Sequence, residues 1–226
     1  MPHMKNKRII DLSHELIPGK EEYHISLKTH FTDDLYPNYI RDDDVWYILQ
    51  DIEMSSHCGT HIEFPYHHNR HGMDAAKFPL SRLIGDCVLL DFRHKKLNEA
   101  VTLDELKELG NKISEGDMLL FNFNCSRFYR TDRSHDRPYI ALDAVEWLIK
   151  EKKISLIGSD ASGIEIKNVP NQPVHQLLMD NEIPIIEFAA NLDELKKERF
   201  TLFVLALAVR GLDSCPVRLI ALEDID

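Results

Sequence analysis

The sequence lacks the features of a membrane-spanning, secreted or nucleic-acid-binding protein. No apolar run approaches the roughly 20 residues that a membrane-spanning helix needs, and the longest, Leu202 to Val209, suits one buried strand. The N-terminal residues have no apolar core like that of a signal peptide. Acidic residues outnumber basic ones, and a net charge of −11 argues against binding to the phosphates of nucleic acid. We therefore expect a cytoplasmic protein.

Cysteine is scarce as well, and its spacing excludes the common zinc modules. The four thiols are scattered along the chain with no CxxC pair, at Cys58, Cys87, Cys125 and Cys215. We expect them to be buried thiols in a reducing compartment rather than disulfides or zinc ligands.

Internal repeats, low-complexity tracts and Gly/Ser linkers are also missing, which favours one domain over residues 1–226. The hydrophobic content of 43% is enough to build a sizeable core. Met1, Pro2 and His3 precede a second methionine and resemble a remnant of expression, so we assign His3 no function.

Hydrophobic patterning predicts strands interleaved with helices. Helices are expected from the capping box at Thr102–Glu105 to Gly110, over Leu142–Lys152, near Pro173–Met179, and from Asn191 onward. Strands are expected at Arg8–Leu12, Val45–Met54, Cys87–Phe92, Met118–Phe123, Ile154–Gly158, Ile183–Phe188, Leu202–Val209 and Val217–Leu222, with a long irregular region between the first two. This order indicates an α/β or α+β layered fold.

One segment, SHCGTHIEFPYHH (residues 56–68), carries four histidines and a carboxylate. His57, His61, Glu63 and His67 share one parity, so an extended segment would place them on one side and Cys58 on the other. A straight strand would spread them over about 33 Å, but Gly59 and Pro65 allow the segment to bend. The segment is therefore either a polar loop or a metal site.

Two further residues favour the metal site. Glu187 lies within the apolar run IPIIEFAA, where a buried carboxylate needs a partner or a metal ion. His175 lies in the first turn of the helix expected just before that run. Each has an ordinary alternative, a solvent-facing carboxylate or a structural core histidine, but one metal site explains all three observations together.

The segment HCGTHIEFPYH resembles HxGTHxDxPxH, the signature of the cyclase family of metal-dependent hydrolases, which includes bacterial kynurenine formamidase and isatin hydrolase. The resemblance extends over nearly the whole chain. DLSHEL is similar to the opening strand of the family, and FPLSRLIGDCVLLDF to the segment that follows the signature. VHQLLMDNEIPIIEFAANLDEL is similar to the second ligand region, and DSCPVRLIAL to the C-terminal strand.

The resemblance implies a swivelling β/β/α fold, a homodimer or homotetramer, and a set of functional residues. His67 matches the catalytic histidine of the family, and the implied metal ligands are His57, His61, Glu63, His175 and Glu187. One position departs from the family signature, because Glu63 stands where it has Asp. An extra methylene moves the carboxylate by roughly 1.5 Å, so its ligation is expected but its bridging of two ions is in doubt.

These ligands suit one or two Zn or Mn ions per chain, since they combine imidazole and carboxylate without thiolate. The expected reaction is hydrolysis of an amide, formamide or lactam bond of a small molecule, with His67 transferring a proton. Nucleophilic catalysis is less attractive, because no GxSxG motif is present and Cys58 has the opposite parity. Two alternatives stay open: a weakly active metal- or ligand-binding homologue, and a lyase or lactonase.

Overall fold

The structure is a computed structural model that describes residues 6–225. The suspected expression remnant therefore lies outside the described residues. Its main element is a nine-stranded sheet in which β5, β7, β9 and β10 run parallel and the other neighbours pair antiparallel. The strands follow one another across the sheet in the order β1 (Lys7–Asp11), β13 (Arg218–Asp224), β11 (Arg199–Leu205), β5 (Ile84–Asp91), β7 (Met118–Asn122), β9 (Leu156–Ser159), β10 (Ile185–Glu187), β4 (His61–Glu63) and β12 (Ser214–Pro216).

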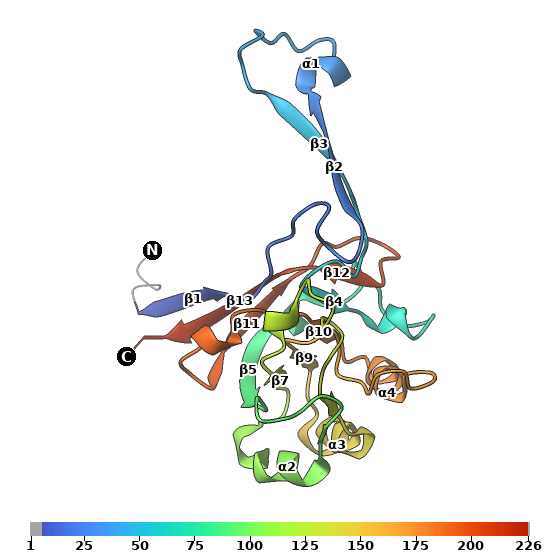
Figure 1. Cartoon of the computed structure of the whole chain (residues 1–226), viewed down its shortest axis with the longest axis vertical. Coiled ribbons are helices and arrows are strands. Elements are labelled where there is room, and N and C mark those ends of the chain that lie inside the picture. The colour runs from blue at the N-terminus through green and yellow to red at the C-terminus, as the bar shows by residue number, and fades with distance from the viewer. Residues whose placement is uncertain (1–5, 226) are drawn as a thin grey trace.

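Three helices pack beside the parallel strands: α2 (Leu103–Glu108), α3 (Leu142–Trp147) and α4 (Pro173–Asp180) (Figure 1). The alternation of a strand sends neighbouring side chains to opposite faces. Leu119 on β7 therefore packs with α2, α3 and α4, whereas Leu120 belongs to a second core. That second core joins the parallel strands to residues of the antiparallel strands, such as Ile10, Leu202 and Leu219. The arrangement confirms the expected layered α+β fold.

Most of the predicted elements are present with shifted ends. The Thr102–Glu105 capping box is formed and opens α2, and the helix expected to follow Ala141 continues as a π-helical turn, Leu148–Lys152, after α3. A short parallel pair, β6 (Ala100–Val101) and β8 (Tyr139–Ile140), completes the body of the molecule. None of the helices among residues 6–225 is both long and apolar enough to cross a membrane.

One predicted helix is wrong. Residues Leu192–Glu194 form only a 3-10 turn, and Asn191 before it has a left-handed backbone with φ of 55° and no capping hydrogen bond. Its side-chain amide instead donates to the carbonyl of Asp11. The residue that the sequence presents as a helix cap therefore ties the turn to β1.

The region expected to be irregular supplies one strand of a β-hairpin. Strands β2 (Ile25–Phe31) and β3 (Ile48–Met54) pair antiparallel and carry the short helix α1 (Thr32–Leu35) near their tip. This hairpin, hereafter the arm (residues 25–54), stands away from the rest of the molecule (Figure 1). The second predicted strand, Val45–Met54, is thus real from Ile48 onward, but it belongs to the arm and not to the core.

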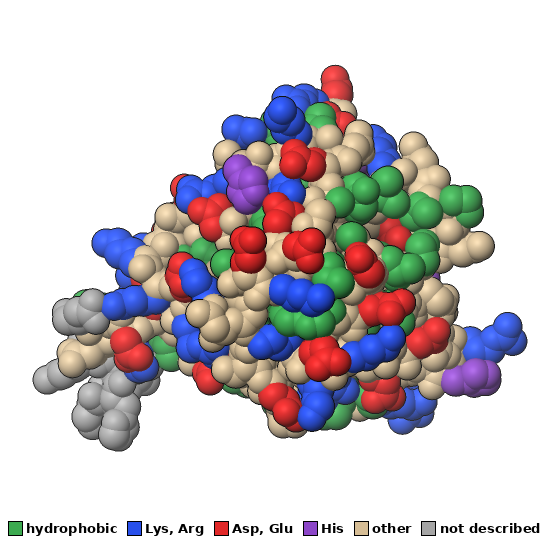
Figure 2. Space-filling view, turned by 90° about the horizontal axis from the view of Figure 1, so that it is seen from below, with side chains coloured by type: hydrophobic (Ala, Val, Ile, Leu, Met, Phe, Trp, Pro, Cys, Tyr) green, Lys and Arg blue, Asp and Glu red, His purple; other side chains and the backbone are tan. Residues whose placement is uncertain are grey.

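The face opposite the arm shows acidic and basic side chains intermingled (Figure 2). No broad area of positive charge is visible on it, which agrees with the net charge of −11.

Candidate metal centre

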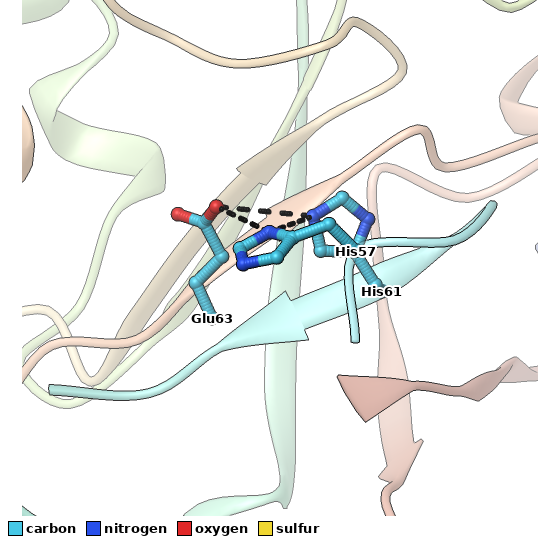
Figure 3. Close-up of side chains that lie close together, drawn as sticks. All are labelled: His57, His61 and Glu63. Atoms are coloured by element: carbon cyan, nitrogen blue, oxygen red, sulfur yellow. Dashed lines mark hydrogen bonds and ion pairs between the residues drawn. The ribbon is translucent and has the colours of Figure 1, made fainter. Parts of the chain in front are cut away.

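Strand β4 is the foundation of the site because it pairs on both edges. His61 lies directly opposite Glu187 of β10 and opposite Pro216 of β12. His61 and Glu63 point to the same side of β4, two residues apart, and His57 reaches the same point from the turn before Gly59 (Figure 3). Gly59 has a φ of +66°, a left-handed value that glycine adopts at little cost. The bend expected at Gly59 therefore gathers ligands that a straight strand would separate.

The imidazole and carboxylate atoms of the signature converge. His57 Nδ1 lies 3.1 Å from Glu63 Oε1 and 3.3 Å from His61 Nε2. His61 Nε2 lies 3.8 Å from Glu63 Oε1 and 3.7 Å from Glu187 Oε2. These separations leave the donor atoms around a common centre, as a metal site requires.

A second group shares Glu63. His175, on the first turn of α4, places Nε2 3.7 Å from Glu63 Oε2 and 3.6 Å from Glu187 Oε1. The two oxygens of Glu63 thereby face different histidines, Oε1 toward His57 and His61 and Oε2 toward His175 without a hydrogen bond. Two sets of three possible ligands result, one of His57, His61 and Glu63 and the other of Glu63, His175 and Glu187.

The rings of His57, His61 and His175 are each oriented by a hydrogen bond at the outer ring nitrogen, which is the one that points away from the cluster. His61 Nδ1 lies 2.8 Å from the Gly59 carbonyl, and His175 Nδ1 lies 2.8 Å from Glu165 Oε2. His57 uses Nε2, 3.1 Å from Asp213 Oδ2. An acceptor on one ring nitrogen places the proton there and leaves the lone pair of the other nitrogen for a metal. The three free nitrogens all face the cluster.

A carboxylate also orients the ring of His67, but this residue lies at the edge of the cluster. It ends the 3-10 helix Pro65–His67, with Nδ1 2.9 Å from Asp213 Oδ2 and Nε2 3.6 Å from Glu63 Oε1. It is about a quarter exposed, with a side-chain accessibility of 26%, whereas that of His61 is 1%. Solvent or a substrate can therefore reach His67. Together with His57 and Asp213 it forms a third set of possible ligands.

The charges of the cluster shift its protonation. Burial raises the pKa of Glu63, but hydrogen bonds from His57 and His61 and the charge of His175 outweigh it and hold that pKa well below its usual range. Burial lowers the pKa of His175, yet Glu165, Glu187 and Glu63 raise it overall to about 10. Burial also opposes the charge on His57, while Glu63 and Asp213 raise its pKa to about 9. A divalent cation would take the place of these protons.

The residues present fit such an ion. Glu63 Oε2 is buried and has no hydrogen-bond partner, which is costly unless a cation satisfies it. The donors are imidazole nitrogens and carboxylate oxygens without thiolate, a set that suits Zn or Mn. Cys58 is buried, and desolvation is the main reason that its pKa rises to about 11, so the structure agrees that it is a poor nucleophile.

The structure brings all six predicted site residues together and adds two that sequence reasoning missed. Asp213 precedes β12, and Glu165 lies in the loop after β9; both are carboxylates that hold a histidine of the cluster. Asp213 lies within the DSCPVRLIAL segment, where an acidic residue next to a strand was the available signal.

A narrow pocket beside the cluster is lined by Tyr23, Gly59, Tyr129 and Phe188 among others. A larger cavity of about 540 Å³ contains none of the cluster residues, so we place the site by its donor atoms.

Comparison with known proteins assigns the chain to a family. The Cyclase family model matches residues 10–166, which is more than half of the chain, and the protein belongs to that family. A kynurenine formamidase from Erythrobacter litoralis is 29% identical over 158 residues, covering 70% of this chain and 69% of that protein. The fold is shared with an isatin hydrolase bound to the product analogue thioisatinate, with a TM-score of 0.83 and 18% identity over 97% of this chain and 93% of that one. A solved structure described as a potential metal-dependent hydrolase with cyclase activity has a TM-score of 0.77 and 26% identity, covering 97% of this chain and all of that one.

Proposed function

We propose that this protein is a metal-dependent hydrolase that cleaves an amide, formamide or lactam bond of a small aromatic molecule. The observation that carries the proposal is the convergence of five donor side chains, three of them histidines whose outer nitrogens are held by acceptors. The family relatives named as kynurenine formamidase and isatin hydrolase support the reaction class.

His57, His61, Glu63, His175 and Glu187 are the proposed ligands, and Zn or Mn is the proposed ion. Glu63 would hold an ion in either set of ligands, because its two oxygens face different sets. The sequence leaves bridging in doubt, and the different directions of the two oxygens support it. A bound ion of this kind polarises a carbonyl and lowers the pKa of water toward about 7.

His67 is the proposed proton carrier. Its Nδ1–H donates to Asp213, which fixes the tautomer and leaves Nε2 free on the side of the cluster. In the proposed mechanism Nε2 accepts a proton from the attacking water and then donates it to the leaving nitrogen. Asp213 also stabilises the imidazolium while it carries the charge, as an oriented carboxylate does in other proton-transfer sites.

The aromatic pocket is the proposed binding place of the substrate ring. The ring of Phe188 lies 6.3 Å from that of His61 and 5.3 Å from that of Tyr129, the latter edge to face. Tyr23 lies 6.3 Å from His57 on another side. The pocket has a volume of only about 20 Å³, so it would have to widen before these side chains could hold a planar ring with its amide substituent at the cluster.

The test is metal analysis followed by an activity screen. Protein purified without chelator is expected to contain one or two Zn or Mn ions per chain and to hydrolyse formanilides or lactams, with activity lost in EDTA and restored by the metal. Metal content near zero after reconstitution would contradict the site. Full metal content without turnover of any amide or lactone would instead favour the weakly active homologue.

We also propose that the protein forms a homodimer or homotetramer in the cytoplasm. Four buried free thiols suit a reducing compartment. The arm exposes large apolar side chains, including Ile40, Trp46 and Ile52, which are 96%, 75% and 65% accessible. A lone two-stranded hairpin is marginally stable in water, and an apolar surface of this kind is typical of an interface.

A further inference from the structure

Arg137 lies beside the cluster with one edge of its guanidinium unused. Nη1 donates to Ser162 Oγ at 3.0 Å and to the His135 carbonyl at 3.4 Å. Nε is buried and has no hydrogen-bond partner, and Nη2 has none either among the described residues. Nor does Arg137 form an ion pair with any carboxylate of residues 6–225. The free nitrogens Nε and Nη2 are the pair that binds a carboxylate side-on.

Gly163 shows where this free edge points. A Cβ atom at Gly163 would lie 2.9 Å from Glu187 Oε1 and 3.2 Å from Arg137 Nη2, so both atoms approach one point above the glycine. The φ of +129° at Gly163 is a value that side chains rarely adopt, and a Cβ atom there would crowd both groups. Arg137 Nη2 and the candidate ligand Glu187 therefore lie close to the same glycine without forming an ion pair with each other.

A purely structural role explains only half of these contacts. The Nη1 bonds to Ser162 and His135 tie the loop before β8 to the loop after β9, but they leave the opposite edge unexplained. A buried donor without a partner costs about 1 to 3 kcal/mol. Glu187 does not supply the missing partner, and its charge would be shared with a metal ion in the proposed site. The Nε and Nη2 donors of Arg137 are then left for an anion from outside the chain.

We infer that the Nε–Nη2 edge of Arg137 binds a carboxylate group of the ligand beside the metal site. This inference rests on the proposed function, which places the scissile amide at the cluster. The carboxylate has two possible sources: the substrate already carries it, as in an N-acylated aromatic amino acid, or ring opening of a lactam creates it. In either case Arg137 determines specificity through a two-point contact that the planar guanidinium provides and a lysine cannot.

The test compares two formamides that differ only in one carboxylate, 2-formamidobenzoate and formanilide, on the metal-loaded protein. If the substrate supplies the carboxylate, Arg137→Gln is expected to raise KM for 2-formamidobenzoate about 10- to 100-fold and to leave formanilide unchanged, the loss expected for a charged hydrogen bond. Arg137→Lys is expected to recover only part of this loss. Arg127→Gln, which changes an exposed arginine nearby, is the matched control and is expected to behave like the parent protein.

The second arm uses isatin, an uncharged lactam, and measures binding of 2-aminobenzoate by calorimetry. If ring opening supplies the carboxylate, Arg137→Gln is expected to lower kcat for isatin with little change in KM. Whichever source supplies the carboxylate, 2-aminobenzoate is expected to bind the Arg137→Gln variant at least about tenfold more weakly than it binds the parent protein. Metal content and melting temperature, measured in parallel, show whether the variant is folded and loaded. A loaded, folded Arg137→Gln protein with parental kinetics on every substrate and parental 2-aminobenzoate affinity would overturn the inference. Failure of the parent to hydrolyse any of them would count against the proposed function, and calorimetry would still test Arg137.

Discussion

At the scale of single residues, Glu63 is the side chain on which both halves of the metal centre depend. Because Oε1 and Oε2 face different ligand sets, we predict two ions per chain in the parent protein. Glu63→Asp withdraws the carboxylate by one methylene and is expected to reduce the stoichiometry to one ion. Glu63→Gln removes the anionic charge and is expected to weaken binding further. Calorimetric titration with Zn or Mn measures both. A parent protein that binds one ion, and a second only after Glu63→Asp, would show that Glu63 does not bridge.

His61 has the most buried imidazole of the centre, so its loss should be felt in both metal affinity and stability. We predict that His61→Ala loses metal and that its melting temperature no longer rises when metal is added, since an ion that binds only the folded state stabilises it. Thermal unfolding with and without excess metal measures this. An equal metal-dependent rise in the parent and the variant would exclude His61 as a ligand.

His67 separates catalysis from metal binding. We predict that His67→Ala retains its ions and loses roughly 10²- to 10⁴-fold in kcat, the usual contribution of a positioned acid or base. Asp213→Asn should also lower kcat, because the amide no longer fixes the tautomer of His67. His71→Ala, at an exposed position in the same segment, is the control. If His67→Ala loses an ion, His67 is a ligand in the set with His57 and Asp213.

The sequence could predict the histidines but not the groups that orient them. His57, His61, Glu63 and His67 lie within eleven residues, so their spacing is visible in the chain. Asp213 is separated from His67 by 146 positions, and only the pairing of β12 with β4 brings it near. The carboxylate of Glu165 is equally inconspicuous, because its role depends on the angle at which α4 presents the ring of His175.

At the scale of elements, helix α2 offers a test of local electrostatics. Glu105 completes the capping box with Thr102 and accepts a hydrogen bond from Lys95 Nζ at 2.8 Å. Burial raises its pKa, but Lys95 and Thr102 outweigh burial and lower the pKa of Glu105 to about 2. The carboxylate is therefore favoured in the folded state. Its contribution is complete above the unfolded pKa of about 4.3 and disappears as the pH falls toward 2.

We accordingly predict that Glu105→Gln lowers the free energy of unfolding by about 0.5 to 1 kcal/mol at pH 7, a small value because solvent screens the pair. The difference from the parent protein should shrink steadily below pH 4.5. Urea unfolding across this range measures it. Glu146→Gln is the control: it breaks an exposed pair between Glu146 on α3 and Lys150 in the π-helical turn that follows, and is expected to change stability by less than about 0.5 kcal/mol. A difference that does not depend on pH would contradict the electrostatic explanation.

The core strands and β3 of the arm were predictable, whereas β2 and its pairing with β3 were not, for one physical reason. Strands such as β7 and β9 are buried along their whole length, and their apolar runs stand out in the sequence. Strand β2 has no buried residue, so no core imposes a pattern on ISLKTHF beyond a weak alternation. The expected helix after Asn191 fails for another reason: Asn191 has a left-handed backbone, and its side-chain amide bonds to the Asp11 carbonyl instead of capping a helix.

At the scale of the whole molecule, the arm divides the protein into a packed body and an exposed hairpin. The central strands β7, β9 and β10 of the nine-stranded sheet are buried along their whole length, while β2 and β3 pair only with each other among the described strands. Leu27 and Ile52 lie opposite each other in the hairpin and are 46% and 65% accessible. This apolar pair stays substantially exposed in the single chain, which makes a second copy of the chain the natural partner under the proposed assembly.

The corresponding prediction is that the parent protein is at least a dimer at micromolar concentration and that the arm holds it together. A combined Ile40→Lys and Ile52→Lys variant places two charges on the exposed apolar surface, and burying them at an interface would cost far more than leaving them in water. We expect the variant to become monomeric, or to dissociate at a higher concentration than the parent, while its metal content is unchanged because neither residue contacts the cluster. Leu80→Lys is the control, since Leu80 is similarly exposed, at 64%, but lies on the body next to β5. Multi-angle light scattering over a dilution series measures the assembly. A monomeric parent protein, or a double variant as oligomeric as the parent, would show that the arm is not the interface.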